Sequence, residues 1–165
     1  MDEKVRRAGA EDLGRLVELA ETARRELEPT RGGSVWIRRE ARPEPVAGSI
    51  AAALDANDQV VLVGELDGAT VGYAIARLET LRDGGLLTVL DDIYVEAGAR
   101  SVGIGELLMG EVIAWATDRG SFGIDSLALP GNRATMNFFE TFGLVARALV
   151  VHRDRRGAGD PPAAG

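Results

Sequence analysis

The chain has 165 residues, of which 45% are hydrophobic and 27% charged, the composition of one soluble globular domain. It contains no cysteine and a single histidine, which excludes disulfides, thiolate nucleophiles and metal sites built from cysteine or several histidines. The net charge of −7 argues against nucleic acid and anionic membranes as partners. Apolar runs are too short to cross a bilayer and charged residues directly follow Met1, so we expect a cytoplasmic protein without a secretory signal.

Hydrophobic periodicity predicts the elements of the first part of the chain. They are a strand at 5–8, helices at 11–27 and 45–56, and strands at 59–66, 69–78 and 86–95. Asp67-Gly68 between two of these strands is a strong hairpin signal, and Pro45 suits the first turn of the second helix. Residues 30–44 are polar and rich in arginine, with Trp36 in the middle, and are predicted to form a long loop.

The second part of the chain is predicted to alternate helices with strands. Its elements are a helix at 102–119, a strand at 124–129, a helix at 132–142 and a last strand at 144–151. The order βααβββαβαβ indicates an α/β fold with a mixed sheet. Residues 1–152 are predicted to form one domain. Residues 153–165 are polar, aperiodic and rich in Gly and Pro, which predicts a disordered tail.

The segment most informative about chemistry is the glycine loop at residues 100–105, which reads R-S-V-G-I-G and opens a predicted helix. Unpaired backbone N–H groups and the helix dipole favour an anion there, and glycines allow close approach, so the loop predicts a pyrophosphate cradle. A dinucleotide fingerprint would need glycine where Leu108 stands, and a mononucleotide P-loop would need a lysine. An incidental tight turn is the other interpretation.

The loop fits the R/Q-x-x-G-x-G/A pattern of the GCN5-related N-acetyltransferase (GNAT) superfamily. Three more segments, at residues 5–13, 64–73 and 132–143, resemble that family in order and spacing, so the resemblance spans residues 5–151. The pair Asp91-Asp92 after Leu90, together with Asn137-Phe138, is similar to spermidine/spermine-type amine acetyltransferases. The resemblance implies a mostly antiparallel central sheet flanked by helices, and an acyl-CoA-dependent N-acetyltransferase.

The resemblance also implies where acetyl-CoA, the acyl donor, binds. Its pyrophosphate would lie on the glycine loop, and its pantetheine arm and thioester on the backbone of the strand 86–95. Asn132 would be a side-chain contact. The cofactor-binding residues predicted in this way are Ile93, Tyr94, Val95, Arg100, Ser101, Val102, Gly103, Ile104, Gly105, Glu106, Asn132 and Asn137. No metal is implied.

Two positions depart from the family pattern. Phe139 stands where the family often has a tyrosine that protonates the departing thiolate. A thiol has a pKa of roughly 8.5, so its thiolate leaves readily and water could protonate it. The other interpretation is a member with weakened or lost activity. Leu127 stands where ribosomal-protein N-terminal acetyltransferases of this family carry a glutamate, which argues against that narrower assignment.

Asp91 and Asp92 are the predicted catalytic residues. An alkylammonium must lose a proton before its nitrogen attacks a thioester, and a carboxylate near the thioester can hold the cation and accept or relay that proton. Strict alternation along the strand predicts that the two side chains lie on opposite faces of the sheet. The alternative interpretation is salt bridging to arginine. Trp36 and Glu79 are predicted to contribute to the acceptor site.

The sequence therefore predicts direct acetyl transfer from acetyl-CoA to a primary amine, without a covalent acyl-enzyme because cysteine is absent. The acidic pair and the net charge favour a small cationic acceptor such as a polyamine, diamine or amino sugar. The alternatives are a protein lysine or N-terminal acetyltransferase and a non-catalytic acyl-CoA-binding module. Relatives are often dimers, so a homodimer stays open.

Overall fold

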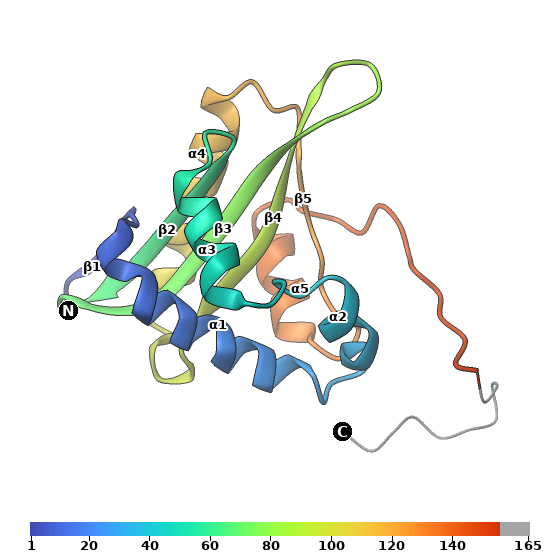
Figure 1. The fold of residues 1–165 in the computed structure, drawn as a ribbon, viewed down its shortest axis with the longest axis horizontal. Helices are drawn as coiled ribbons and strands as arrows, with labels where there is room; N and C mark the ends of the chain where they lie inside the picture. The colour runs from blue at the N-terminus through green and yellow to red at the C-terminus, as the bar shows by residue number, and fades with distance from the viewer. Residues whose placement is uncertain (156–165) are drawn as a thin grey trace.

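The computed structural model describes residues 1–155 and places a five-stranded sheet between two layers of helices (Figure 1). The strands follow one another in the sheet in chain order. They are β1 Glu3–Arg7, β2 Gln59–Leu66, β3 Ala69–Thr80, β4 Leu86–Val95 and β5 Ile124–Ser126. The first four are antiparallel neighbours, and β5 runs parallel to β4. Most of the predicted tail, residues 156–165, lies outside the described residues.

The hairpin predicted between β2 and β3 is confirmed. Asp67 and Gly68 both have positive φ, at 50° and 83°, which is the conformation of a two-residue turn whose twist matches that of the flanking strands. The central residues of both strands, 60–64 in β2 and 72–76 in β3, are buried without alternation, as expected where a sheet is covered on both faces.

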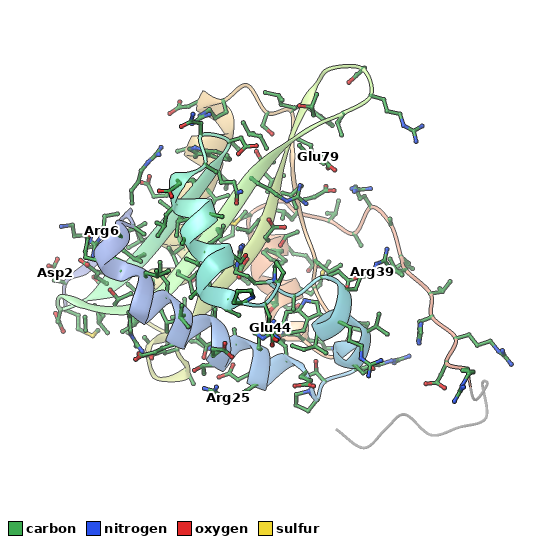
Figure 2. All side chains as sticks on the ribbon, viewed as in Figure 1. Asp2, Arg6, Arg25, Arg39, Glu44 and Glu79 are labelled. Carbon is green, nitrogen blue, oxygen red and sulfur yellow. The ribbon has the colours of Figure 1, made fainter. Side chains whose placement is uncertain are left out.

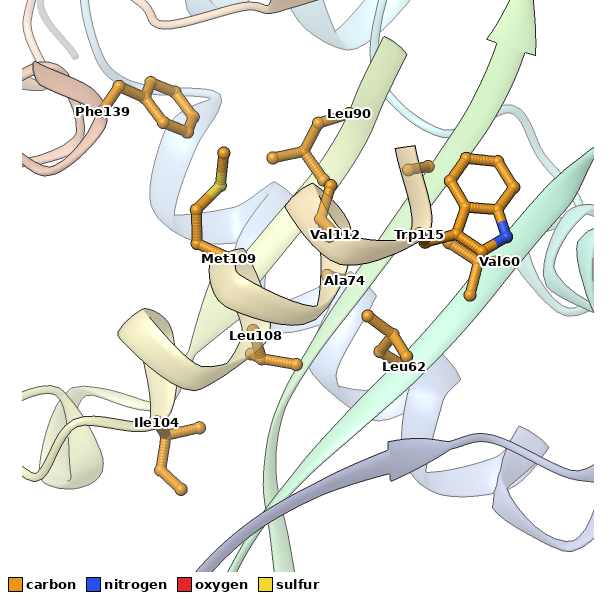
Figure 3. Close-up of a cluster of buried hydrophobic side chains, with 11 residues drawn as sticks. Val60, Leu62, Ala74, Leu90, Ile104, Leu108, Met109, Val112, Trp115 and Phe139 are labelled. Atoms are coloured by element: carbon orange, nitrogen blue, oxygen red, sulfur yellow. The ribbon is translucent and has the colours of Figure 1, made fainter. Parts of the chain in front are cut away.

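Helices α1 Leu13–Leu27 and α3 Val46–Asp55 cover one face of the sheet. The buried side chains of this layer include Leu16, Leu19, Ile50, Val63, Tyr73 and Ile75. Helices α4 Ile104–Asp118 and α5 Arg133–Thr141 contribute the core of the opposite face (Figure 3). The buried side chains of this second layer include Leu62, Leu90, Leu108, Met109, Val112, Trp115 and Phe139.

The predicted loop at 30–44 is partly wrong, because it contains the short helix α2 Gly33–Arg39. Gly32 precedes this helix with φ of 87°. A Cβ on Gly33 would lie 2.3 Å from the carbonyl oxygens of Leu27 and Glu28, so only glycine fits this tight return from α1. Seven residues are too few for hydrophobic periodicity to distinguish a helix from a polar loop.

The predicted last strand at 144–151 is also wrong for the described chain. These residues follow Gly143, whose φ is 83°, and join no strand ladder. Val145 and Val151 are 78% and 92% exposed. A side-chain pattern predicts which residues suit a strand, but a strand forms only where a partner backbone supplies hydrogen bonds. The strand predicted at 124–129 likewise stops at Ser126, where its pairing with β4 ends.

Candidate active site

Strand β4 contains a β-bulge at the two adjacent carboxylates. Along the β3–β4 ladder, Ile75 lies opposite Asp92, whereas the next residue, Ala76, lies opposite Leu90. Asp91 is therefore an extra residue with no partner in β3. A bulge of this kind redirects the side chains beside it and changes the face to which the following residues point.

The prediction that Asp91 and Asp92 lie on opposite faces is wrong. Asp92 accepts a hydrogen bond from the Tyr73 hydroxyl at 2.9 Å, and Asp91 accepts one from Arg77 Nε at 3.0 Å. Tyr73 and Arg77 are separated by four positions in β3, whose pairing with β2 is regular there, so they share one face. Tyr73 packs in the α1/α3 layer. Both carboxylates consequently lie on the α1/α3 face, because the bulge interrupts the alternation.

Asp92 belongs to a buried network. The Arg42 guanidinium donates to it from Nη2 at 2.5 Å and from Nε at 3.1 Å, and only 8% of the Arg42 side chain and 11% of the Asp92 side chain are exposed. Arg42 Nη1 also donates to Ser49 Oγ at 2.9 Å. Burial opposes the guanidinium charge, but the hydrogen bonds and charge of Asp92 outweigh it and raise the pKa of Arg42. Burial, together with Asp92, raises the pKa of Tyr73 well above its ordinary value, so its hydroxyl stays a donor.

Asp91 is the more accessible of the two carboxylates. Its side chain is 30% exposed, and that of its ion-pair partner, Arg77, is 40% exposed. Partial burial raises the pKa of Asp91; the nearby charge of Arg77 opposes that rise and the charge of Asp92 adds to it. Asp91 thus combines access to solvent with a raised affinity for a proton, and both properties favour a carboxylate that accepts a proton from a substrate.

Hydrogen bonds and ion pairs hold the connection between α2 and α3 beside this acidic pair. Arg24 of α1 donates from Nη1 to the Arg42 carbonyl oxygen at 2.7 Å and from Nη2 to Glu44 at 2.8 Å. The Arg42 side chain then reaches Asp92 of β4. Arg42 was not identified from the sequence. Its partner Asp92 is 50 residues away along the chain, and nothing in the Arg-rich stretch distinguishes Arg42 from its neighbouring arginines.

Strands β4 and β5 pair only over Thr88, Val89 and Leu90. At the end of this pairing, Ser126 Oγ donates to the Leu90 carbonyl at 2.9 Å. Beyond Leu90, β4 continues to Val95 along β3 while its other edge has no β5 partner. The predicted pantetheine contacts Ile93, Tyr94 and Val95 all lie in this half-paired part of β4, so backbone groups on that edge are available to an extended ligand.

The predicted cradle lies directly after β4 and the short helix Ala97–Ala99. Gly103 is the N-terminal residue flanking α4 and has φ of 88°, a conformation that favours glycine, and no side chain caps the helix there. Since a helix begins at Ile104, the N–H groups of its first turn have no acceptor within the helix. Val102 and Ile104 pack into the core of the α4 layer, whereas Ser101 and Glu106 are exposed. The loop therefore presents backbone donors with a positive helix end behind them.

Helix α5 lies against the beginning of α4. A Cβ on Gly105 would lie 3.3 Å from the Phe138 ring, so glycine allows this approach. Asn132, predicted as a cofactor contact, is the N-cap of α5, and its Oδ1 accepts from Thr135 N–H at 3.2 Å. Asn137 is exposed on the same helix. Phe139 is 3% exposed and lies among the buried side chains of the α4 layer (Figure 3). Its ring centroid lies 5.9 Å from that of Phe138.

A polar cluster joins α1 to the end of β4. Arg100 donates from Nε to the Val95 carbonyl at 2.9 Å and from Nη2 to Glu26 at 2.7 Å. The Tyr94 hydroxyl donates to the other Glu26 oxygen at 2.9 Å, and the Arg100 guanidinium lies 5.5 Å from the Tyr94 ring centroid. Burial and Glu26 raise the pKa of Tyr94. Glu26 was not identified from the sequence, because its partners are 68 and 74 positions away.

Within residues 1–155, no hydrogen bond or ion pair joins either of the two predicted acceptor residues to the acidic pair. Trp36 lies half-buried on α2, whose end leads toward Arg42. Glu79 lies exposed near the end of β3, opposite Leu87, and Figure 2 shows it toward the β3–β4 hairpin, apart from Glu44. Within residues 1–155, no group of acidic or histidine side chains could hold a metal ion. No helix of that part is long and apolar enough to span a membrane.

Comparisons with known proteins agree with this arrangement. The family model described as "Acetyltransferase (GNAT) family" matches residues 16–144. A structure of AAC(6')-Iy in complex with the bisubstrate analogue CoA-S-monomethyl-acetylneamine has a TM-score of 0.71 at 19% identity, over 94% of this chain and 99% of that one. The aminoglycoside acetyltransferase meta-AAC0020, from an uncultured soil metagenomic sample and in complex with sisomicin, has a TM-score of 0.68 at 19% identity, over 91% and 93%.

A transcriptional regulator from Bacillus halodurans C-125 is similar to the same extent, with a TM-score of 0.70 at 18% identity, over 93% of this chain and 99% of that one. No curated protein sequence matches the chain. At these identities the solved structures establish the fold, while the family model covers most of the sequence. The chain belongs to the GNAT acetyltransferase family and is an acyl-CoA-dependent N-acetyltransferase.

Proposed function

We propose that this enzyme transfers the acetyl group of acetyl-CoA to the primary amine of a small cationic acceptor by direct attack of the amine on the thioester. The observation that carries the proposal is the bulge of β4, which gathers Asp91 and Asp92 on one face of the sheet where β4 loses its β5 partner. An acidic pair on that face attracts a cation, and the free strand edge accommodates an extended donor.

The donor would be held mainly by backbone groups. The N–H groups at the start of α4 would bind the pyrophosphate, with Gly103 giving the loop its turn. The edge of β4 over Ile93, Tyr94 and Val95 would bind the pantetheine arm. Arg100 would position the end of β4 rather than contact the donor, since its guanidinium already donates to Glu26 and to the Val95 carbonyl.

The two carboxylates would have different roles. Asp91, partly exposed and with a raised pKa, would bind the substrate ammonium and accept its proton. Asp92 would be a positioning residue, because Arg42 and Tyr73 already occupy it and fix the bulge. Once deprotonated, the amine nitrogen forms a bond to the thioester carbon. The oxygen becomes an oxyanion that backbone N–H groups of β4 would stabilise.

Collapse of this intermediate breaks the carbon–sulfur bond and restores the carbonyl. As the amide forms, its nitrogen loses its second proton to water, and the departing coenzyme A thiolate takes a proton from water in return, because the ring of Phe139 has no hydroxyl to donate. Tyr94 lies in the part of β4 where the thioester is proposed to bind, and its phenol could in principle protonate the thiolate. Its hydroxyl, however, already donates to Glu26. A thiolate is a sufficiently good leaving group for this assignment, with a thiol pKa of roughly 8.5.

The acceptor class follows from charge. The protein has a net charge of −7, and the acidic pair adds a local field that survives salt better than the overall one. Polyamines, diamines and amino sugars meet this requirement. The structural similarity to AAC(6')-Iy and to an enzyme in complex with sisomicin supports including amino sugars among the first acceptors tested.

The test is an amine-library screen that follows free thiol released from acetyl-CoA, with mass spectrometry of the acetylated product. We expect amine-dependent release for cationic small molecules and much less for their neutral analogues. Faster turnover on lysine-containing or N-terminal peptides would replace this proposal with a protein acetyltransferase. Tight acetyl-CoA binding without turnover on any amine would identify a non-catalytic module.

A further inference from the structure

The ion pair between Arg77 and Asp91 engages only one atom of each side chain. Arg77 Nε donates to Asp91 Oδ2 at 3.0 Å. In the described part of the chain, neither Nη1 nor Nη2 of Arg77 donates a hydrogen bond, and Asp91 Oδ1 accepts none. A guanidinium has five N–H donors and a carboxylate has two acceptor oxygens. The pair therefore keeps the terminal N–H groups of Arg77 and one oxygen of Asp91 available to a ligand.

The neighbouring pair of Arg42 and Asp92 differs in this respect. Arg42 donates to Asp92 through both Nε and Nη2, and the Tyr73 hydroxyl donates to the same carboxylate. Only 8% and 11% of these two side chains are exposed, compared with 40% of Arg77 and 30% of Asp91. The buried pair is thus occupied by the protein itself, whereas the partly exposed pair has both the unused groups and the access that a substrate needs.

We propose that Asp91 and Arg77 bind the acceptor together and select amines with a hydroxyl or ether oxygen on a carbon close to the nitrogen, as in amino sugars and amino alcohols. This inference rests on the proposed function and narrows its acceptor class. The remaining oxygen of Asp91 binds the ammonium, and the terminal N–H groups of Arg77 donate to the substrate oxygen. Because the Nε–Oδ2 hydrogen bond holds the two side chains together, they suit a nitrogen and an oxygen on neighbouring carbons.

A polyamine without oxygen fits this pair less well. Its ammonium on Asp91 would lie beside the Arg77 guanidinium, and like charges repel. Its hydrocarbon chain would then cover the N–H groups of Arg77 without accepting a hydrogen bond, which costs free energy. Glu79 lies two residues further along β3 on the same face, toward the β3–β4 hairpin (Figure 2), so a second ammonium could reach it only by passing Arg77.

An acceptor with a carboxylate or phosphate group is disfavoured for the opposite reason. Such a group would bind the Arg77 guanidinium strongly on its own. Here, however, Asp91 and Asp92 lie on the same face, Glu79 is close along β3, and the protein has a net charge of −7. These negative charges repel an anion. A neutral oxygen accepts from Arg77 without this repulsion.

The first experiment compares three amines on the wild-type protein by thiol release from acetyl-CoA. They are the aminocyclohexanol with its hydroxyl on the carbon beside the amine, the isomer with the hydroxyl on the opposite side of the ring, and cyclohexylamine. Rates are expressed per concentration of unprotonated amine, because the nearby hydroxyl also lowers the basicity of the nitrogen. We expect kcat/KM to be about tenfold higher for the first amine, the effect of one hydrogen bond to a charged group.

The second experiment repeats the comparison with Arg77→Gln. The basicity of each amine is the same in both proteins, so a change in the ratio of two kcat/KM values reports Arg77 alone. The preference for the neighbouring hydroxyl should fall about tenfold, mainly through a higher KM for that amine, because Arg77 contacts the acceptor away from the reacting atoms. Arg82→Gln, at an exposed arginine in the turn between β3 and β4, makes the same change of charge and should keep the wild-type ratio.

Equal rates on the three amines with the wild type would overturn the inference, and so would a preference that persists in folded Arg77→Gln. Faster acetylation of the analogue with a carboxylate in place of the neighbouring hydroxyl would overturn the assignment of a neutral oxygen. These results leave the proposed function standing, because each includes turnover of a small amine. Absence of turnover on every amine would instead overturn the proposed function and this inference with it.

Discussion

The Arg42 guanidinium and the Asp92 carboxylate form a buried ion pair, with Nη2 and Oδ1 2.5 Å apart. This pair joins the connection before α3 to the bulge of β4. Because Tyr73 donates to the same carboxylate, the charge of Asp92 is matched by donors on two sides. The pair therefore sets the shape of the acidic site while leaving Asp91 accessible.

Removing Arg42 should cost more stability than removing other arginines of the same segment. In Arg42→Gln the Asp92 carboxylate stays buried without its counter-ion, for which we expect a loss of about 3 kcal/mol in the free energy of unfolding. Urea denaturation measures it. Arg39→Gln is the matched control, since the Arg39 side chain is 71% exposed, and should change stability by less than about 0.5 kcal/mol. Equal effects of the two substitutions would contradict a buried pair.

Asp91→Asn and Asp92→Asn should separate catalysis from positioning. With the best amine acceptor, Asp91→Asn is expected to lower kcat/KM about 100-fold or more without a loss of thermal stability, because this is the size of effect that loss of a general base produces. Asp92→Asn should lower the melting temperature and act mainly on KM. Asp58→Asn, at an exposed carboxylate immediately before β2, is the control for net charge. If both variants kept wild-type turnover, the base would have to be sought at Glu79 or in water.

Two carboxylates, Asp91 and Asp12, should contribute to the free energy of unfolding with opposite dependence on pH. Burial raises the pKa of Asp91, so the folded state binds its proton more tightly and ionisation of Asp91 costs stability as pH rises. The hydrogen bond from Arg6 lowers the pKa of Asp12, which adds stability above the ordinary carboxyl pKa that is lost as pH falls.

The check is the difference in unfolding free energy between each variant and wild type, from about pH 3 to pH 7. Asp91→Asn should become relatively more stable as pH rises through this range, and Asp12→Asn relatively less stable. Differences that do not vary with pH would show that neither carboxylate titrates as its surroundings imply.

Substitutions in α4 test the cradle. Gly105→Val should abolish coenzyme A binding, because a branched side chain in the first turn meets Phe138 and covers the backbone donors. Gly110→Val is the matched control in the same helix, since a Cβ there has no neighbour within 4 Å. Calorimetry should find unchanged affinity only for Gly110→Val. Unchanged affinity in a folded Gly105→Val protein would contradict the cradle.

Phe139→Tyr tests the missing acid. We expect turnover at or modestly above the wild-type rate, with a stability loss of about 1–3 kcal/mol if the new hydroxyl finds no partner in the core. Phe142→Tyr, in a less buried ring of the same helix end, controls for the added hydroxyl. A large loss of turnover in folded Phe139→Tyr would mean that the unmodified ring is needed for packing or donor contact.

The sequence predicted the features that are local. The hairpin at Asp67-Gly68, the strand Leu86–Val95 and the glycine loop before α4 each depend on neighbouring residues, and each lies where it was expected. Features that depend on distant partners were not predictable. The bulge exists only relative to the register of β3, and Arg42 and Glu26 reach β4 and its following loop from 50 to 74 positions away.

The acidic pair depends on the number of residues in β4 as well as on their type, because the one extra residue of the bulge is Asp91 itself. Deleting the codon for residue 91 would place Leu90 and Asp92 opposite Ala76 and Ile75 as consecutive partners, which is an uninterrupted ladder. Asp92 would keep its face and its contact with Arg42, so the fold could persist while the accessible carboxylate disappeared. With Asp91 as the proposed base, we expect the protein with this single deletion to bind acetyl-CoA without transferring its acetyl group.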